Sequence, residues 1–173
     1  MADIYVTIPH ILRWEGGFVN HKDDKGGATN KGITLSTWKS CGYDKDGDGD
    51  IDVDDLKIIT VEDFEKVFRR FYWNRWKADE IKSQSVADIL VDWVYNSGAN
   101  GIKIPQRLLG LNADGVVGAK TIAAVNAEDP KAFFNKVWKA RSDFFIGIVK
   151  RNPSQKVFLK GWQNRLNSIT FKS

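Results

Sequence analysis

Apolar residues recur at helical spacing along most of the chain, so the pattern predicts a mainly α-helical protein. In residues 3–15 they share one side, which predicts a first helix ending at Glu15; these positions are Ile4, Ile8, Ile11 and Leu12. Five glycines then interrupt the pattern between residues 16 and 34. This stretch is too irregular for a helix, and we expect a small β-hairpin that closes at Ile33–Thr34.

Four more helices are predicted downstream. Thr60 and Asp63 have the spacing of a capping box, with Asp in place of the usual Glu. Residues 85–97 form a second helix that Gly98 terminates. Asp129-Pro130 opens a long helix, and Pro153 opens the last one. The apolar positions that define these helices are Phe64, Val67, Phe68 and Phe71; Val86, Ile89, Leu90, Trp93 and Val94; Phe133, Phe134, Val137, Trp138, Phe144, Phe145 and Ile148; and Phe158, Trp162, Leu166 and Ile169.

Composition is that of a soluble globular protein, with 42% hydrophobic and 28% charged residues in 173. This length supports one substantial core, and no apolar run approaches the ~20 residues that span a bilayer. We therefore expect a monomer without stable membrane insertion. The single cysteine, Cys41, excludes an intrachain disulfide. Residues 1–5 lack the features of a secretory signal, which predicts synthesis in the cytoplasm and delivery by another system.

Charge is distributed unevenly along the chain. The net charge is +4, but residues 44–55 carry seven Asp and one Lys, so the remainder carries +10. A surface this basic favours a polyanionic partner such as nucleic acid, an acidic membrane or bacterial cell wall. The chain has no basic run, zinc-finger spacing or aromatic RNA-binding signature, so nucleic acid is not expected.

The acidic segment from Asp44 to Asp55 fits a twelve-residue calcium loop position by position. The predicted ligands are the side chains of Asp44, Asp46, Asp48 and Asp55 and the main-chain carbonyl of Asp50, with Asp52 acting through water. The alternative is a solvated acidic turn, but so many carboxylates repel one another without a cation. We expect a structural Ca²⁺. The loop resembles those of dockerin modules, which carry two repeats; this chain has one, so scaffold docking is not expected.

Glu15 is the candidate catalytic residue. The negative end of a helix dipole disfavours an ionised carboxylate there, and Trp14 and Phe18 flank it. A protonated acid is what glycoside cleavage requires for donation to the leaving oxygen. Asp23, Asp24, Thr29 and Asn30 follow, with groups that can hold a water or stabilise an oxocarbenium ion. The alternative is that Glu15 is an ordinary surface residue before a glycine-rich loop.

The segment Arg13-Trp14-Glu15-Gly16-Gly17-Phe18-Val19-Asn20, with residues 24–34 (DKGGATNKGIT), resembles the signature of glycoside hydrolase family 108, the phage-type N-acetylmuramidases. The resemblance implies a lysozyme-like helical fold, with Glu15 as proton donor in cleavage of the β-1,4 bond between N-acetylmuramic acid and N-acetylglucosamine. Phage lysozymes pair such a Glu with an Asp nine positions later, here Asp24, and then a Thr. Thr29 comes one position earlier than in that pattern, so Asp24 and Thr29 are predicted site residues without assigned roles.

The C-terminal half resembles a peptidoglycan-binding domain in residues 106–110, 114–118 and Thr121. We therefore expect a catalytic part over residues 1–97, with the calcium loop as an insertion, and a peptidoglycan-binding-like part over residues 98–173, packed into the same compact unit. The ending Asn96-Ser97-Gly98 also resembles the family. Tyr95, Asn96 and Trp73 are predicted to contact saccharide; the equally weighted alternative is that they are buried aromatics and a helix cap.

A muramidase without a secretory signal and with a basic surface would suit a phage endolysin. Other functions directed at the cell wall are alternatives to it. A non-catalytic peptidoglycan-binding module would leave Glu15 incidental, and a lytic transglycosylase would use a single acid and yield an anhydro product. A zinc amidase is disfavoured because the only two histidines, His10 and His21, lack metal-site spacing. Nothing around Cys41 suggests the activated thiolate of a cysteine peptidase.

Overall fold

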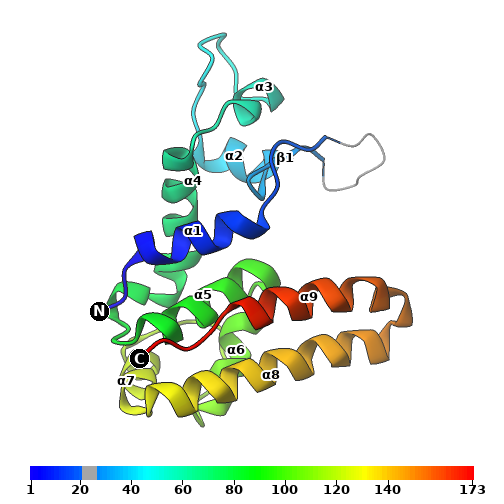
Figure 1. Cartoon of the computed structure of the whole chain (residues 1–173). Helices are drawn as coiled ribbons and strands as arrows, with labels where there is room; N and C mark the ends of the chain where they lie inside the picture. The colour runs from blue at the N-terminus through cyan, green and yellow to red at the C-terminus, as the bar shows by residue number, and fades with distance from the viewer. Residues whose placement is uncertain (21–26) are drawn as a thin grey trace. The chain divides into compact units, whose positions relative to one another are not determined.

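The computed structural model describes residues 1–20 and 27–173, and it has the predicted mainly α-helical fold with one small antiparallel sheet (Figure 1). In chain order the elements are α1 (Ile4–Trp14), β1 (Thr29–Asn30), β2 (Ile33–Thr34), α2 (Leu35–Cys41), α3 (Val53–Lys57), α4 (Val61–Phe68), the π-helical η1 (Arg69–Trp73), the 3₁₀ turns η2 (Asn74–Trp76) and η3 (Ala78–Glu80), α5 (Gln84–Ser97), α6 (Asn100–Leu108), α7 (Ala119–Ala127), α8 (Pro130–Arg151), the 3₁₀ turn η4 (Pro153–Gln155) and α9 (Lys156–Ser168).

Contacts divide the chain into two compact units. The N-terminal unit contains residues 5–71, and the C-terminal unit contains residues 1–4 and 72–173. The expected division after residue 97 follows sequence motifs, whereas this one follows packing and falls between Phe71 and Tyr72.

In the N-terminal unit, α1 ends one residue before the predicted position, and Ile8 and Ile11 on its inner side are buried. Ile4, the first residue of the helix, is also buried but belongs to the C-terminal unit. The predicted hairpin is confirmed, with Thr29 opposite Thr34 and Asn30 opposite Ile33. Its turn residues, Lys31 and Gly32, have φ values of 51° and 78°. Positive φ at both central positions is the requirement of a type I′ turn, whose twist matches that of the strands.

The predicted capping box of α4 is also confirmed. The Thr60 hydroxyl accepts from the Asp63 N–H at 3.2 Å, and the Asp63 carboxylate accepts from the Thr60 N–H at 2.8 Å. These bonds satisfy donors that the first helical turn otherwise leaves unpaired. Phe64, Val67 and Phe68 then face the core, where each is buried.

In the C-terminal unit, α5 packs against α6 and α8, and α8 packs against α9 (Figure 1). The long helix α8 begins as predicted, with Asp129 accepting from the Ala132 N–H at 2.8 Å and Pro130 in the first turn. Gly98 ends α5 with φ 62°, a conformation that favours glycine.

The last helix differs from the prediction. Pro153 opens a 3₁₀ turn, and α9 starts only at Lys156. Phe158, an expected core residue in the first turn of α9, is 52% exposed and stacks on Trp162 at a ring-centroid distance of 6.0 Å. Leu166 and Ile169 at the other end of the helix are buried as expected.

An ionic cluster lies in the core of the C-terminal unit. The Asp92 carboxylate is fully buried between Arg141 Nη2 at 2.7 Å and Arg165 Nη2 at 2.8 Å. Burial alone would raise the pKa of Asp92, but the two guanidinium groups hold it below its usual value. The cluster therefore links α5 to both α8 and α9.

The first residues of the chain belong to the C-terminal unit. The Ala2 N–H donates to the Ile81 carbonyl at 2.8 Å, and the Asp3 N–H donates to Gln84 Oε1 at 2.7 Å. Gln84 Nε2 returns a bond to the Asp3 carbonyl at 3.1 Å. Among the described residues, no helix is both long and apolar enough to cross a bilayer.

Candidate active site

Glu15 follows the last residue of α1 and is half-buried. Gly16 and Gly17 come next, and an added Cβ at either position would meet no atom within 4 Å among the described residues outside its chain neighbours. The backbone directly after Glu15 therefore carries no side chain and is not packed against the described part of the protein.

Thr29 is connected to the segment that leads away from Glu15. Val19, four residues after Glu15, forms an isolated bridge with Thr29, in which each N–H donates to the other's carbonyl at 2.8 Å. The small sheet thus orders Thr29 against the strand-like segment after the candidate acid. The other predicted partner, Asp24, lies outside the described residues, as do Asp23 and His21.

Asn30 has a structural role that its sequence position did not reveal. Its side chain is buried, and Nδ2 donates to the Leu56 carbonyl at 2.8 Å and the Lys57 carbonyl at 3.2 Å. Both acceptors lie at the end of α3. The amide hydrogens are therefore used to hold the hairpin to the helix that follows the acidic loop.

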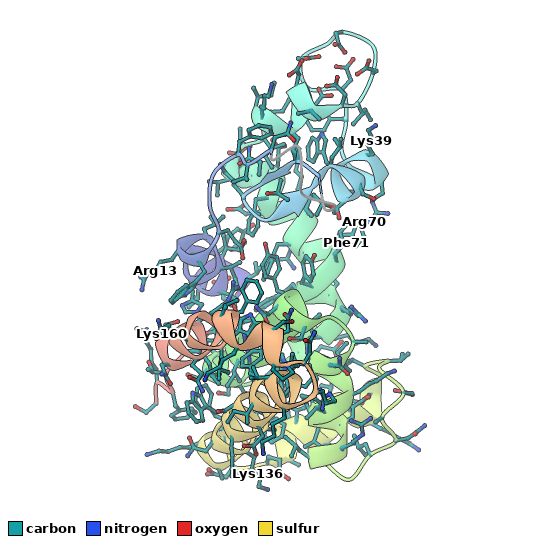
Figure 2. The ribbon with its side chains drawn as sticks, turned by 90° about the vertical axis from the view of Figure 1, so that its right-hand side faces the viewer. Arg13, Lys39, Arg70, Phe71, Lys136 and Lys160 are labelled. Atoms are coloured by element: carbon teal, nitrogen blue, oxygen red, sulfur yellow. The ribbon has the colours of Figure 1, made fainter. Side chains whose placement is uncertain are left out.

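The acidic loop lies between α2 and α3, where carboxylate oxygens crowd together (Figure 2). Carboxylate oxygens of Asp44, Asp46 and Asp48 lie within 4.8 Å of one another, and those of Asp50, Asp52 and Asp55 form a second group of the same kind. Asp44 also accepts the Gly47 and Gly49 N–H groups at 2.6 and 2.8 Å, and φ is 80° and 104° at these glycines. The loop thus wraps back over its first residue.

Asp55 lies beneath this loop with no exposed surface. One carboxylate oxygen accepts the Lys45 N–H at 2.6 Å and the Asp46 N–H at 3.1 Å, and the other accepts the Asp52 N–H at 2.8 Å. The bond from the Asp52 backbone contributes most to lowering the pKa of Asp55. Asp55 therefore joins the two ends of the loop.

Lys45 connects the loop to α4. Its Nζ lies 3.0 Å from the buried carboxylate of Asp63 and 3.1 Å from the Tyr43 hydroxyl. Burial works to raise the pKa of Asp63, but hydrogen bonds from Thr60 and Lys45 bring it below its usual value. The one cation of the acidic segment is thus used in packing the loop onto the neighbouring helix.

The three predicted saccharide contacts all lie in the C-terminal unit but differ in exposure. Trp73 is fully buried and its Nε1 donates to Asp79 at 2.8 Å, so its ring packs in the core and has no surface for a sugar. Tyr95 is half-buried, with the Tyr72 ring edge-on at 4.7 Å and the Arg165 guanidinium 5.6 Å from its centroid. Asn96 is exposed at the end of α5.

Gln106 organises the motif of the C-terminal half. It is buried; Nε2 donates to Asp114 at 3.1 Å and to the Val116 carbonyl at 3.0 Å, and Oε1 accepts the Gly115 N–H at 3.0 Å. These bonds fix the loop between α6 and α7. Beside it is a cavity of about 490 Å³ lined by Gln106, Gly110, Leu111, Asn112, Asp114, Val116, Gly118, Ala119, Lys120 and Thr121.

Comparison with known proteins gives two family matches and relatives among the solved structures. Residues 8–98 match the family model described as glycosyl hydrolase 108, and residues 100–167 match a predicted peptidoglycan domain. A solved structure, "Structure of Brucella abortus SagA", is 32% identical with a TM-score of 0.75; the alignment covers 95% of this chain and 90% of that chain. None of the curated proteins compared with the chain matches it.

Proposed function

This chain belongs to the glycosyl hydrolase 108 family, and from that premise we propose that it is a muramidase, with Glu15 as the acid that cleaves the β-1,4 bond between N-acetylmuramic acid and N-acetylglucosamine. Its class is that of a glycoside hydrolase with a lysozyme-like fold, and its partner is peptidoglycan. The observation that carries the finer assignment is the placement of Glu15 at the end of α1, half-buried and followed by two glycines that no described residue packs against.

The proposed reaction begins with Glu15 in its protonated form. The carboxyl group donates its proton to the glycosidic oxygen as the bond from that oxygen to C1 breaks, and positive charge develops on the sugar ring. A water then adds to C1 and gives up one proton to a carboxylate, either Glu15 itself or Asp24 and from there Glu15, so that Glu15 ends protonated again. Asp24 and the Thr29 hydroxyl are the proposed groups for positioning this water or stabilising the charged ring.

Saccharide binding by the C-terminal unit is the second part of the proposal. Tyr95 and Asn96 are the proposed contacts because both reach the surface at the end of α5. The buried Trp73 supports the fold there instead. A tyrosine ring offers an apolar face to the C–H groups of a sugar, and an amide offers both a donor and an acceptor to its hydroxyls.

We also propose that residues 44–55 bind a structural Ca²⁺. The loop contains two groups of three carboxylates, and the oxygens within each group lie within 4.8 Å of one another. Calcium prefers six to eight oxygen ligands. Asp55, the last predicted ligand, already accepts three backbone N–H groups and is the only predicted ligand without exposed surface. A cation here would relieve repulsion among the carboxylates and pin the loop above α3, to which the hairpin is attached through Asn30.

The test of the catalytic assignment compares Glu15→Gln with Glu65→Gln, a half-buried glutamate of the same unit on α4. Purified peptidoglycan is digested with each variant, and the products are followed by reducing-sugar release and mass spectrometry. We expect Glu15→Gln to release no reducing sugar at an unchanged melting temperature, and Glu65→Gln to match the parent.

Product masses separate the competing functions. Muropeptides with a reducing N-acetylmuramic acid support the proposal, whereas 1,6-anhydro products indicate a lytic transglycosylase. Products cut within the stem peptide indicate a different wall hydrolase. Binding without products indicates a non-catalytic module. Full activity of Glu15→Gln would refute the role of this residue whatever the products are.

A further inference from the structure

A second cavity lies in the N-terminal unit, between α2 and α4. Its volume is about 180 Å³, and its walls come from Trp38, Cys41, Gly42, Tyr43, Asp63, Lys66, Val67 and Arg70. A core cavity of about 150 Å³ is large enough to hold benzene. The space therefore accommodates a ligand with one small ring or an equivalent apolar group.

The Trp38 side chain gives the cavity an aromatic wall. Trp38 is 2% exposed, and its Nε1 has no hydrogen-bond partner among the described residues. A Cβ at Gly42 would overlap Cε2 and Cδ2 of Trp38, the two carbons that its rings share, so Gly42 packs directly against the indole in the cavity wall. A ligand in the cavity would therefore pack on a fixed, largely apolar ring.

The charges around the cavity are mainly positive. Lys66 and Arg70 both line it, and neither forms an ion pair with a carboxylate in the part of the chain that the structure describes. Figure 2 labels Arg70 where α4 passes into η1. The one carboxylate in the wall, Asp63, is neutralised by Lys45 at 3.0 Å and accepts from the Tyr43 hydroxyl at 3.2 Å.

We propose that this cavity binds a small organic carboxylate, with the carboxylate held by Lys66 and Arg70 and its apolar body packed on Val67 and the Trp38 ring. Two cations with several N–H donors match the acceptors of a carboxylate, which has no donor of its own when ionised. The walls formed by Val67, Gly42 and the aromatic rings disfavour a ligand that is polar throughout. The proposal is independent of the muramidase assignment, because none of these residues takes part in it.

The alkylation rate of the single cysteine can be used to probe the cavity. Cys41 lines it, so alkylation of this chain reports on this one site. Burial raises the pKa of the Cys41 thiol, and the neighbouring Arg70 works in the opposite direction. Iodoacetate and iodoacetamide attack the same thiolate, so the ratio of their rates cancels the thiolate fraction and measures the attraction of the cavity for a carboxylate.

The first experiment measures this rate ratio, relative to N-acetylcysteine, in the parent and in three variants. We expect the ratio to fall by about threefold or more in Lys66→Gln and in Arg70→Gln, since each removes a nearby cation. Lys39→Gln is the control because Lys39 is an exposed cation on α2 outside the cavity wall, and its ratio should equal that of the parent. Equal ratios in all four proteins would overturn the proposal.

The second experiment tests binding itself. Benzoate should slow the alkylation of Cys41 by iodoacetamide and shift one indole N–H signal in the NMR spectrum, the signal that Trp38→Phe removes; benzamide, which is neutral, should do neither. N-acetyl-D-alanine is run beside benzoate. Stronger protection by the alanine derivative indicates the carboxylate of a peptidoglycan stem as the natural ligand, and stronger protection by benzoate indicates a soluble metabolite. The proposal would be wrong if benzamide protected Cys41 as well as benzoate does, or if none of the three compounds protected it.

Discussion

The side-chain amide of Asn30 donates to the main-chain carbonyl of Leu56 across 2.8 Å, and this bond connects the hairpin to α3, the helix that follows the acidic loop. A second bond from the same nitrogen reaches Lys57 at 3.2 Å. The hairpin is therefore connected through α3 to the acidic loop within the N-terminal unit. A substitution that destabilises either one should also destabilise the other.

Asn30→Ala should destabilise the protein by about 1–3 kcal/mol, because it leaves the Leu56 carbonyl without its side-chain donor in a buried position. Urea unfolding measures the loss. Asn164→Ala, at an exposed position of α9, is the matched control and should stay within about 0.5 kcal/mol of the parent. If the two variants unfold at the same urea concentration, the bond has no energetic importance.

Chelation should lower the melting temperature by several degrees, and added Ca²⁺ should restore it. At a calcium concentration of about a hundred times Kd, binding to the folded state alone adds about 2.7 kcal/mol. Asp44→Ala should abolish the response to calcium. Asp54→Ala should keep it, because Asp54 is exposed and pairs with Lys57 outside the predicted ligand set. A parent protein that melts identically with chelator and with calcium would exclude the structural ion.

The buried cluster around Asp92 predicts a specific acid sensitivity. Its pKa is lower in the folded protein than in the unfolded chain, so its contribution is complete above the ordinary Asp pKa of about 3.9 and declines as the pH falls toward the folded value. Asp92→Asn should cost about 3–5 kcal/mol near neutral pH by leaving two guanidinium groups without their carboxylate.

Urea unfolding between about pH 6 and pH 3 measures this dependence. The slope of stability against pH should be shallower in Asp92→Asn than in the parent. Asp143→Asn, which removes the exposed ion pair with Lys139, should keep the parental slope and cost no more than about 1 kcal/mol. Parallel slopes in all three proteins would contradict the assigned pKa shift.

Two glycine-to-alanine substitutions should have opposite effects. Gly42→Ala would place its Cβ against the buried ring of Trp38, and such overpacking costs about 1–3 kcal/mol. Gly161→Ala lies within α9 with no atom inside 4 Å of the new Cβ, so it should gain about 0.5–1 kcal/mol from helix propensity. In thermal melts, the melting temperature of Gly42→Ala should be lower than that of the parent and that of Gly161→Ala higher. A melting temperature of Gly42→Ala above that of the parent would contradict the prediction.

Local features of this fold could be predicted from sequence because their partners lie within a few residues. The capping box of Thr60 and Asp63, the start of α8 at Pro130 and the hairpin around Gly32 are all of this kind. Each depends on backbone donors or dihedral angles that a short segment determines by itself.

Features that depend on distant residues could not be predicted. Asn30 was expected near a catalytic water, but its acceptor is 26 residues away, on a helix whose position only the fold determines. A tryptophan that stacks on a sugar and one that fills the core look alike in a sequence, and in this fold Trp73 is completely buried. The roles of Glu15 and Asp24 stay predictions, because only the activity of variants at these positions tests them.

The membership of residues 1–4 in the C-terminal unit has a practical consequence for dissecting the protein. Because the chain leaves that unit after Ile4 and returns at Tyr72, no single cut of the polypeptide releases either unit with all of its parts. A fragment that starts at Tyr72 would lack the Ala2 N–H that pairs with the Ile81 carbonyl. A separately expressed C-terminal unit would need its first four residues joined back on by a linker.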